Sequence, residues 1–398
     1  MQRRFVVFLT VAGLLGCRDA NRPTAPRPLA DASAAASSYE IIDLGSLGGN
    51  GEALAINAGG QVVGWSETAP GTRHAFLWED GVLQDLGALN GGSSEAAAIN
   101  ARGEVAGVST DAAGSHAVLW VQGVLQDLGP GGSAGSVHLS ESGRVAWTTS
   151  TPTGAHAALW VGQQVRDLGT LGGPFSIAAG VNDRGEVAGG SAVSFGGPDH
   201  AFLWRDGVMQ DLGTLGGTVS TAFAINARGQ VTGIAYDASH TGHAFLWDGL
   251  MLDLGWLPSD RASRGAMIND RGEVAGTSCP SECGGGPEDP FLWDGKTMQQ
   301  AGGPDYERGF EDRVTAMNER GQVVGFREQG LPRHAFLWDG ATLDLGTLSG
   351  QFSHSAALAI NDRGDIVGWS EDASFTLHPV LWRRAPASPA ASVVTSGP

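Results

Sequence analysis

One unit of about 43 residues occurs eight times in tandem along most of the chain, and three short markers recur in it in a fixed order. The first marker is His-Ala-Phe-Leu-Trp, found at residues 74–78 and repeated with variation. Its copies end, at intervals of 40 to 46 residues, at Trp78, Trp120, Trp160, Trp204, Trp247, Trp293, Trp338 and Trp382. The second is Asp-Leu-Gly, first found at Asp43, and the third is Ala-Ile-Asn-x-x-Gly-x-Val-x-Gly, first found at residues 55–64. A repeat of this length requires a fold in which each unit packs against its neighbours.

Each unit contains four segments of strand length separated by turn signals. In the first unit, residues 57–60 (Asn-Ala-Gly-Gly) separate the first two segments, and residues 80–81 (Asp-Gly) separate the last two. Asn, Asp and Gly tolerate the positive φ of tight hairpins. A period of 3.6 residues, typical of helices, is absent from the repeat. Two hairpins per unit indicate a four-stranded propeller blade, with an open β-solenoid as the structural alternative.

The two ends of the repeat region complement each other. Residues 39–44 form a segment of the fourth type with no unit before it, and the last unit ends after its third segment, residues 378–382. We therefore expect the first segment to pair beside the last and close the ring, which leaves no free sheet edge. The prediction is an all-β fold: one closed β-propeller of eight four-stranded blades over residues 39–382, followed by a disordered tail, residues 383–398.

The start of the chain has a different composition. Arg3 and Arg4 precede an apolar run, residues 5–16. As a helix this run would rise about 18 Å, too little to cross a bilayer core of about 30 Å. A positive start, a short apolar segment and small residues at its end are typical of a secretory signal peptide, here residues 1–16.

The end of this segment resembles a bacterial lipobox. Residues 14–17 read Leu-Leu-Gly-Cys, and the resemblance implies that Cys17 is acylated and becomes the first residue of the mature protein. Arg18 follows the Cys, which by resemblance to Gram-negative lipoprotein sorting favours the outer membrane, periplasmic or cell-surface. Residues 18–38 are rich in Ala, Ser and Pro and indicate a flexible tether.

Charge excludes several classes of partner. The formal charge is −18, from 24 Lys and Arg against 42 Asp and Glu, and Lys296 is the one Lys. Nucleic acid and anionic lipid surfaces both require a basic footprint. We therefore expect no nucleic-acid partner and membrane contact only through the lipid anchor.

Most of the His residues occupy the same position of the repeat. Seven of ten begin the first marker, at His74, His116, His156, His200, His243, His334 and His378. A metal-binding interpretation is disfavoured because each lies on a third strand, one blade from the next. We expect a structural hydrogen bond instead, and we expect the Asp of Asp-Leu-Gly to accept backbone N–H groups where the chain turns. The sequence predicts neither a metal site nor a cofactor.

Two further Cys residues lie in the sixth unit. Cys279 and Cys283 are four residues apart, and in an exported protein this spacing predicts a loop disulfide. A zinc site would need four ligands, and no neighbouring motif completes the set.

With these markers the chain resembles the bacterial extracellular HAF-repeat proteins, named for the His-Ala-Phe motif found here at residues 74–76. The resemblance covers nearly all of residues 39–382. It implies an exported repeat protein and no agreed ligand.

Strand alternation places the short turns on one rim of the ring and the longer loops on the other. Long variable loops are typical of a working rim, and units 6 and 7 depart most from the repeat. Their opening loops carry aromatic residues beside Arg, which can stack on a sugar or pair with carboxylates. The candidate ligand-binding residues are Trp256, Arg261, Arg264, Tyr306, Arg308, Phe310 and Arg313. The alternative is a drifted repeat without a function.

The sequence favours a surface-anchored, non-catalytic binding or scaffold module for a polysaccharide or an envelope protein. One alternative is a polysaccharide hydrolase or lyase with its site on the long-loop rim, which rests on analogy between folds. Another is a structural role in an envelope assembly. The Gly-x-Ser-x-Gly of residues 131–135 lies in a Gly-rich loop rather than in the strand-to-helix turn that a nucleophile elbow needs.

Overall fold

The computed structural model describes residues 39–283, 288–302, 312–327, 332–350 and 352–385. The predicted signal peptide, Cys17 and the tether lie outside this range, as does nearly all of the predicted tail. In the described part of the chain, no helix is long and apolar enough to cross a membrane.

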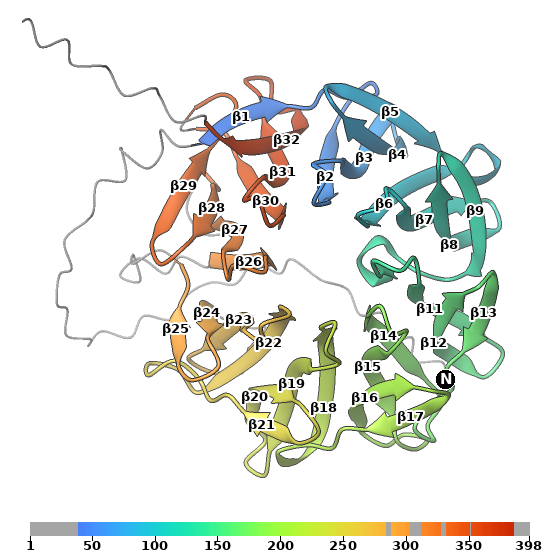
Figure 1. Cartoon of the computed structure of the whole chain (residues 1–398), viewed down its shortest axis with the longest axis vertical. Coiled ribbons are helices and arrows are strands. Elements are labelled where there is room, and N and C mark those ends of the chain that lie inside the picture. The colour runs from blue at the N-terminus through green and yellow to red at the C-terminus, as the bar shows by residue number, and fades with distance from the viewer. Residues whose placement is uncertain (1–38, 284–287, 303–311, 328–331, 351, 386–398) are drawn as a thin grey trace, which may run out of the picture. The chain divides into compact units, whose positions relative to one another are not determined.

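Eight four-stranded antiparallel sheets form a ring, with the first strand of each sheet towards the centre and the fourth outside (Figure 1). The first two blades consist of β2 (Gly51–Ile56), β3 (Val62–Ala69), β4 (Thr72–Glu79), β5 (Val82–Gly87), and β6 (Ser93–Ile99), β7 (Val105–Asp111), β8 (Gly114–Val121), β9 (Val124–Pro130). The third and fourth consist of β10 (His138–Leu139), β11 (Val145–Thr151), β12 (Gly154–Val161), β13 (Gln164–Asp167), and β14 (Ser176–Val181), β15 (Val187–Ala192), β16 (Asp199–Arg205), β17 (Val208–Asp211).

The remaining blades follow the same order. The fifth and sixth consist of β18 (Gly216–Ile225), β19 (Val231–Asp237), β20 (Gly242–Trp247), β21 (Met251–Asp253), and β22 (Ala262–Ile268), β23 (Val274–Cys279), β24 (Asp289–Trp293), β25 (Met298–Gln300). The seventh and eighth consist of β26 (Asp312–Met317), β27 (Val323–Arg327), β28 (Ala335–Trp338), β29 (Thr342–Gly346), and β30 (Ser355–Ile360), β31 (Ile366–Glu371), β32 (Leu377–Arg384), β1 (Tyr39–Asp43). Two short 3-10 helices, Leu89–Gly91 and Ala134–Ser136, lie in loops.

The ring is closed by the two ends of the repeat region. Strand β1 pairs antiparallel with β32, with Ile41 opposite Trp382, so the eighth sheet has the order β1-β32-β31-β30. The predicted eight-bladed propeller with its N-terminal strand in the last blade is therefore confirmed.

The Gly that ends the third marker is required by close packing of the backbone. A Cβ on Gly64 of β3 would overlap the carbonyl oxygen of Glu52 in β2, and the corresponding Gly of six other blades meets the same obstacle. In the third blade the fully buried Trp147 takes this place, and there the inner strand β10 is only two residues long. The Gly therefore allows each inner strand its full length.

The apolar core lies between the blades. One cluster joins Val63 and Ala75 of the first blade to Ala96 and Trp120 of the second. The Trp120 indole is nearly fully buried, and its Nε1 donates to the Leu86 carbonyl of the preceding blade at 2.9 Å. The aromatic residues of the first marker thus hold adjacent blades together.

The His and Asp of the markers form a repeated pair. Nδ1 of His74 lies 2.9 Å from Oδ2 of Asp85 in the neighbouring outer strand, and Oδ1 of Asp85 accepts the N–H of Gly87 at 2.7 Å. Equivalent His–Asp contacts recur in six other blades. Both residues therefore have the structural roles that the sequence indicated.

Candidate functional site

The candidate site is built on the rim that carries the short hairpin turns, here called the short-turn rim. Its turns are joined by Asn side chains: Nδ2 of Asn57 donates to the carbonyl of Asn100 at 3.0 Å, and Nδ2 of Asn318 to that of Asn361, also at 3.0 Å. This bond is found at seven of the eight junctions between adjacent blades. The bond from Asn361 to Asn57 joins the last blade to the first.

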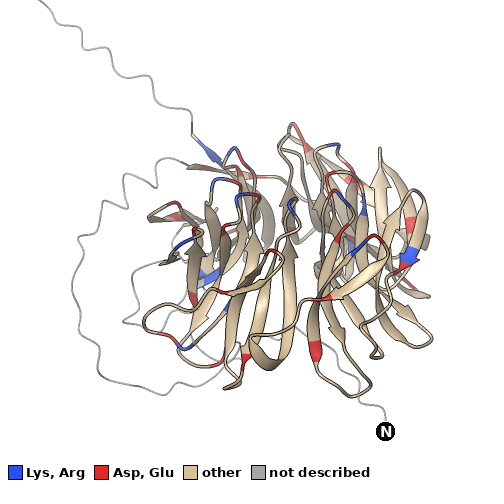
Figure 2. Ribbon diagram, turned by 60° about the horizontal axis from the view of Figure 1, so that its bottom comes forward, with Lys and Arg blue, Asp and Glu red and all other residues tan. Residues whose placement is uncertain are grey.

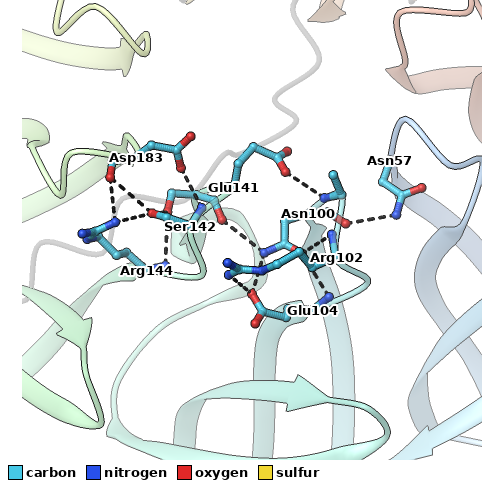
Figure 3. Close-up of polar contacts among 10 residues, drawn as sticks. Asn57, Asn100, Arg102, Glu104, Glu141, Ser142, Arg144 and Asp183 are labelled. Carbon is cyan, nitrogen blue, oxygen red and sulfur yellow. Dashed lines mark hydrogen bonds and ion pairs between the residues drawn. The ribbon is translucent and has the colours of Figure 1, made fainter.

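The eighth junction, between the third and fourth blades, has different contacts, because Ser140 replaces Asn in the third blade (Figure 3). The Arg144 guanidinium donates to the Asp183 carbonyl at 2.6 Å, and the Ser142 N–H donates to the Asp183 side chain at 2.7 Å. The bridge is longer but still connects the turns, so polar contacts link all eight turns around the rim.

Arginines form a second ring above these turns. Six blades carry Arg two residues after the Asn, at Arg102, Arg184, Arg228, Arg271, Arg320 and Arg363. Each reaches towards the turn Gly of the next blade; Nη2 of Arg320, for example, lies 3.0 Å from where a Cβ on Gly364 would be. The first and third blades have Gly59 and Ser142 in place of the Arg. The ring is therefore interrupted in these two turns, and the turn of the first blade borders the junction with the last blade.

A pocket of about 570 Å³ opens at this junction. We call it the seam pocket; its lining residues are Ile42, Gly59, Gly60, Trp78, Asp80, Gly81, Arg363, Asp365 and Arg383. Pockets of this volume are typical of small-ligand sites. The seam pocket lies on the short-turn rim. The ligand site predicted from the sequence lies on the opposite rim, in the long loops.

Two guanidinium groups converge in the seam pocket. Nη1 of Arg363 and Nη2 of Arg383 lie 3.9 and 3.8 Å from the point that a Cβ on Gly60 would occupy. Gly60 has a φ of +91°, which favours Gly, and its lack of a side chain leaves this space open. The pocket therefore places two cations around one small volume.

The Asp365 carboxylate forms an ion pair with only one of these arginines, Arg383. Nε of Arg383 lies 3.4 Å from Oδ1 of Asp365. Within the described residues the Arg363 guanidinium has no acceptor; only its backbone N–H is bonded, to Asn361. Arg is always charged and presents a planar fork of donors, so Arg363 is available for an anionic group.

The rest of the pocket combines apolar and acidic groups. Ile42 and the mostly buried Trp78 supply apolar surface, and Asp80 is exposed in its turn. Figure 2 shows the charged residues mainly in turns and loops at the strand ends, with largely uncharged sheets between them. The pocket is thus a place where two cations, two carboxylates and an apolar wall meet.

The predicted long-loop residues are only partly described. Tyr306, Arg308 and Phe310 lie outside the described residues. The Trp256 ring packs edge-on against His243, with ring centroids 4.7 Å apart. The other three described members of the predicted set are Arg261, Arg264 and Arg313.

Arg264 and Arg261 make contacts within the sixth blade. Nη2 of Arg264 lies 2.7 Å from Glu288, and the Arg261 N–H donates to the Cys279 carbonyl. Cys279 and Cys283 are joined by a disulfide with Cα atoms 5.4 Å apart. None of the four described residues of the predicted set lines the seam pocket.

A second polar cluster lies where the first two blades meet. Nη2 of Arg73 is 3.0 Å from Oε2 of Glu95, and its guanidinium carbon lies 5.1 Å from the centre of the Trp65 ring. Burial raises the pKa of Glu95, and burial together with the charge of Glu95 raises the pKa of Glu52. This pair was not predicted from the sequence, although only the first two units carry Glu at this position of the inner strand.

In the part of the chain that the structure describes, no three His, Cys, Asp or Glu side chains are grouped as metal ligands would be.

No protein-family model and no curated protein matches the chain. Solved structures that resemble it include the β-propeller domain of the Trilobed protease from Pyrococcus furiosus, with 14% identity over 74% of this chain and 98% of that chain and a TM-score of 0.48. The Aleuria aurantia lectin has 11% identity over 86% and 97%, with a TM-score of 0.34. An ulvan lyase has 11% identity over 71% and 90%, with a TM-score of 0.39. Likeness at this level carries no information on function.

Proposed function

We propose that this protein is an exported lipoprotein whose propeller is a non-catalytic binding module for an envelope or extracellular polysaccharide. The signal-like residues 1–16 and the lipobox-like Cys17 support export and anchoring. The His-Ala-Phe repeats support membership of the extracellular HAF-repeat proteins. The acidic composition argues against nucleic acid and anionic lipid as partners.

The observation that carries the binding role is the seam pocket. It is concave, about 570 Å³ in volume, and lined by a few charged groups beside an apolar wall. This combination suits one or two sugar units better than a protein surface, because standard protein interfaces are large and nearly flat. A ring held by Asn bonds at every junction but one gives the pocket a rigid base.

A glycan array tests the proposal. The full-length chain is kept in a detergent without a sugar headgroup, so that the detergent does not compete for the site. We expect binding to at least one class of bacterial polysaccharide, and competition by the same glycan in solution. Binding to no glycan, with capture of an envelope protein instead, would contradict the proposal and favour a protein partner.

Glu52 and Glu95 favour a second candidate, a polysaccharide hydrolase or lyase. Carboxyl groups with a raised pKa are typical of general acids, burial raises the pKa of Glu52, and the neighbouring Arg73 can stabilise an anion. Release of reducing ends or unsaturated sugars from polysaccharides would support this function. Activity that survives in both Glu52→Gln and Glu95→Gln would exclude the pair as its source.

A further inference from the structure

We infer that the seam pocket recognises a sugar unit that carries one anionic group, a carboxylate or a sulfate ester. The inference rests on the proposed function and names the class of glycan that the module would take.

One of the two arginines beside Gly60 has no carboxylate partner within the described residues. The tips of Arg363 and Arg383 both lie within 4 Å of the open space beside Gly60. Oδ1 of Asp365 lies 3.4 Å from Nε of Arg383, and within the described residues no carboxylate forms an ion pair with Arg363. A carboxylate or sulfate placed between the two guanidinium groups would accept charge-assisted hydrogen bonds from both.

The junction of the fourth and fifth blades has two arginines at the equivalent positions, Arg184 and Arg205. There Glu186 lies 2.8 Å from Arg184 and 4.0 Å from Arg205, so one carboxylate faces both guanidinium groups. At the seam the shorter Asp365 takes the place of Glu186. A ligand anion would supply the second acceptor that Glu186 supplies in the protein itself.

The seam also has open space beside its two arginines. The turn of the fifth blade carries Arg228, whereas the first blade has Gly59. The seam therefore has room for a ring, with Trp78 and Ile42 as its apolar wall. The Asp80 and Asp365 carboxylates can accept hydrogen bonds from sugar hydroxyls, while they repel densely charged polyanions.

Calorimetric titration of the full-length chain tests the inference with defined probes. The probes are trigalacturonic acid, its neutral methyl ester, a monosulfated galactose trisaccharide and inorganic phosphate. We expect the acid or the sulfate to bind at least tenfold more tightly than the neutral ester. The two anionic probes then distinguish a carboxylate from a sulfate as the recognised group.

Three variants locate the site. Arg363→Ala should weaken binding of the anionic probe at least tenfold, whereas the matched variant Arg184→Ala should leave it unchanged. Asp365→Glu should also weaken binding, because the longer side chain can reach Arg363 as Glu186 reaches Arg184. Arg363 and Arg184 are exposed whereas Asp365 is buried, and thermal unfolding of each variant checks that the ring is intact.

The outcomes separate this inference from the proposed function. Equal binding of the acid and its neutral ester, unaffected by Arg363→Ala, would overturn the inference and leave a glycan-binding module in place. Binding of phosphate alone would overturn it as well, because the pocket would then select a free anion rather than a sugar. Absence of binding to any glycan on the array would overturn the proposed function itself.

Discussion

Nδ1 of His378, in the last strand of the ring, lies 2.9 Å from Oδ2 of Asp43, in the first. The other blades make this contact between residues about ten positions apart, as in His74 and Asp85. Because the repeat is divided between the ends of the propeller, the same contact here joins residues 335 positions apart. A pair that supports one blade elsewhere therefore helps to close the ring at the seam.

Replacement of this Asp should loosen the seam specifically. We expect Asp43→Ala and Asp85→Ala each to lower the free energy of unfolding by about 1 kcal/mol, because both lose a half-exposed His contact and a bond to a Gly N–H. Only Asp43→Ala should speed amide exchange in β1. Equal exchange in β1 for the two variants would contradict a closing role for Asp43.

Loss of one Asn from the ring of turns should cost more. Asn318 is buried; its Nδ2 donates to Gln322 and to the Asn361 carbonyl, and its Oδ1 accepts two backbone N–H groups. Asn318→Ala leaves these groups unpaired, so we expect a loss of about 3 kcal/mol of unfolding free energy. Ser140→Ala serves as the control and should cost about 1 kcal/mol. Denaturant unfolding that finds equal losses would refute the special role of the Asn.

His138 should make the protein sensitive to acid. Desolvation of the His138 ring lowers its pKa from 6.5 to about 4. In the unfolded chain the ring protonates near pH 6.5, so its contribution to stability is full above that pH and is lost as the pH falls towards 4. The difference amounts to about 3 kcal/mol at pH 4. His138→Leu should flatten the decline between pH 6.5 and 4 in chemical denaturation, and an unchanged slope would show that other groups cause it.

Arg73 should hold down the pKa values of two partly buried carboxyl groups. Burial already raises the pKa of Glu52 and of Glu95, and the charge of Arg73 opposes both shifts. In Arg73→Ala we expect both pKa values to rise further, measured by NMR titration of the carboxyl carbons. Arg205→Ala, at a distant junction, is the control. No change on removal of Arg73 would show that its guanidinium is not coupled to this pair.

Much of the fold could be predicted because turn residues recur between the strands of every repeat and mark where each strand begins and ends. The turn signals at residues 57–60 and 80–81 divide the strands, and the unpaired segment at residues 39–44 predicts the closure. The shortened β10 was not predicted, because it depends on how Trp147 packs against a neighbouring backbone. Contacts of that kind depend on three-dimensional spacing rather than on any pattern in the chain.

The candidate site was harder to predict. Uniform short turns indicated a structural rim, and the long loops that carry Trp256 and Arg264 indicated the ligand-binding rim. Two departures within the turns did mark the seam: Gly59 replaces an Arg, and Asp365 replaces a Glu or Gln. Each is a small change alone, and they meet only because the ring closes with the eighth blade beside the first.

Hydrogen exchange of the full-length chain with and without its bound glycan tests the central claim most directly. The account predicts slower exchange in the turns that form the seam pocket, residues 58–60, 80–81 and 363–365, with little change elsewhere. Slower exchange confined to the long-loop rim around residues 256–264, with the seam unchanged, would contradict it and place the site where the loops of the sixth blade lie.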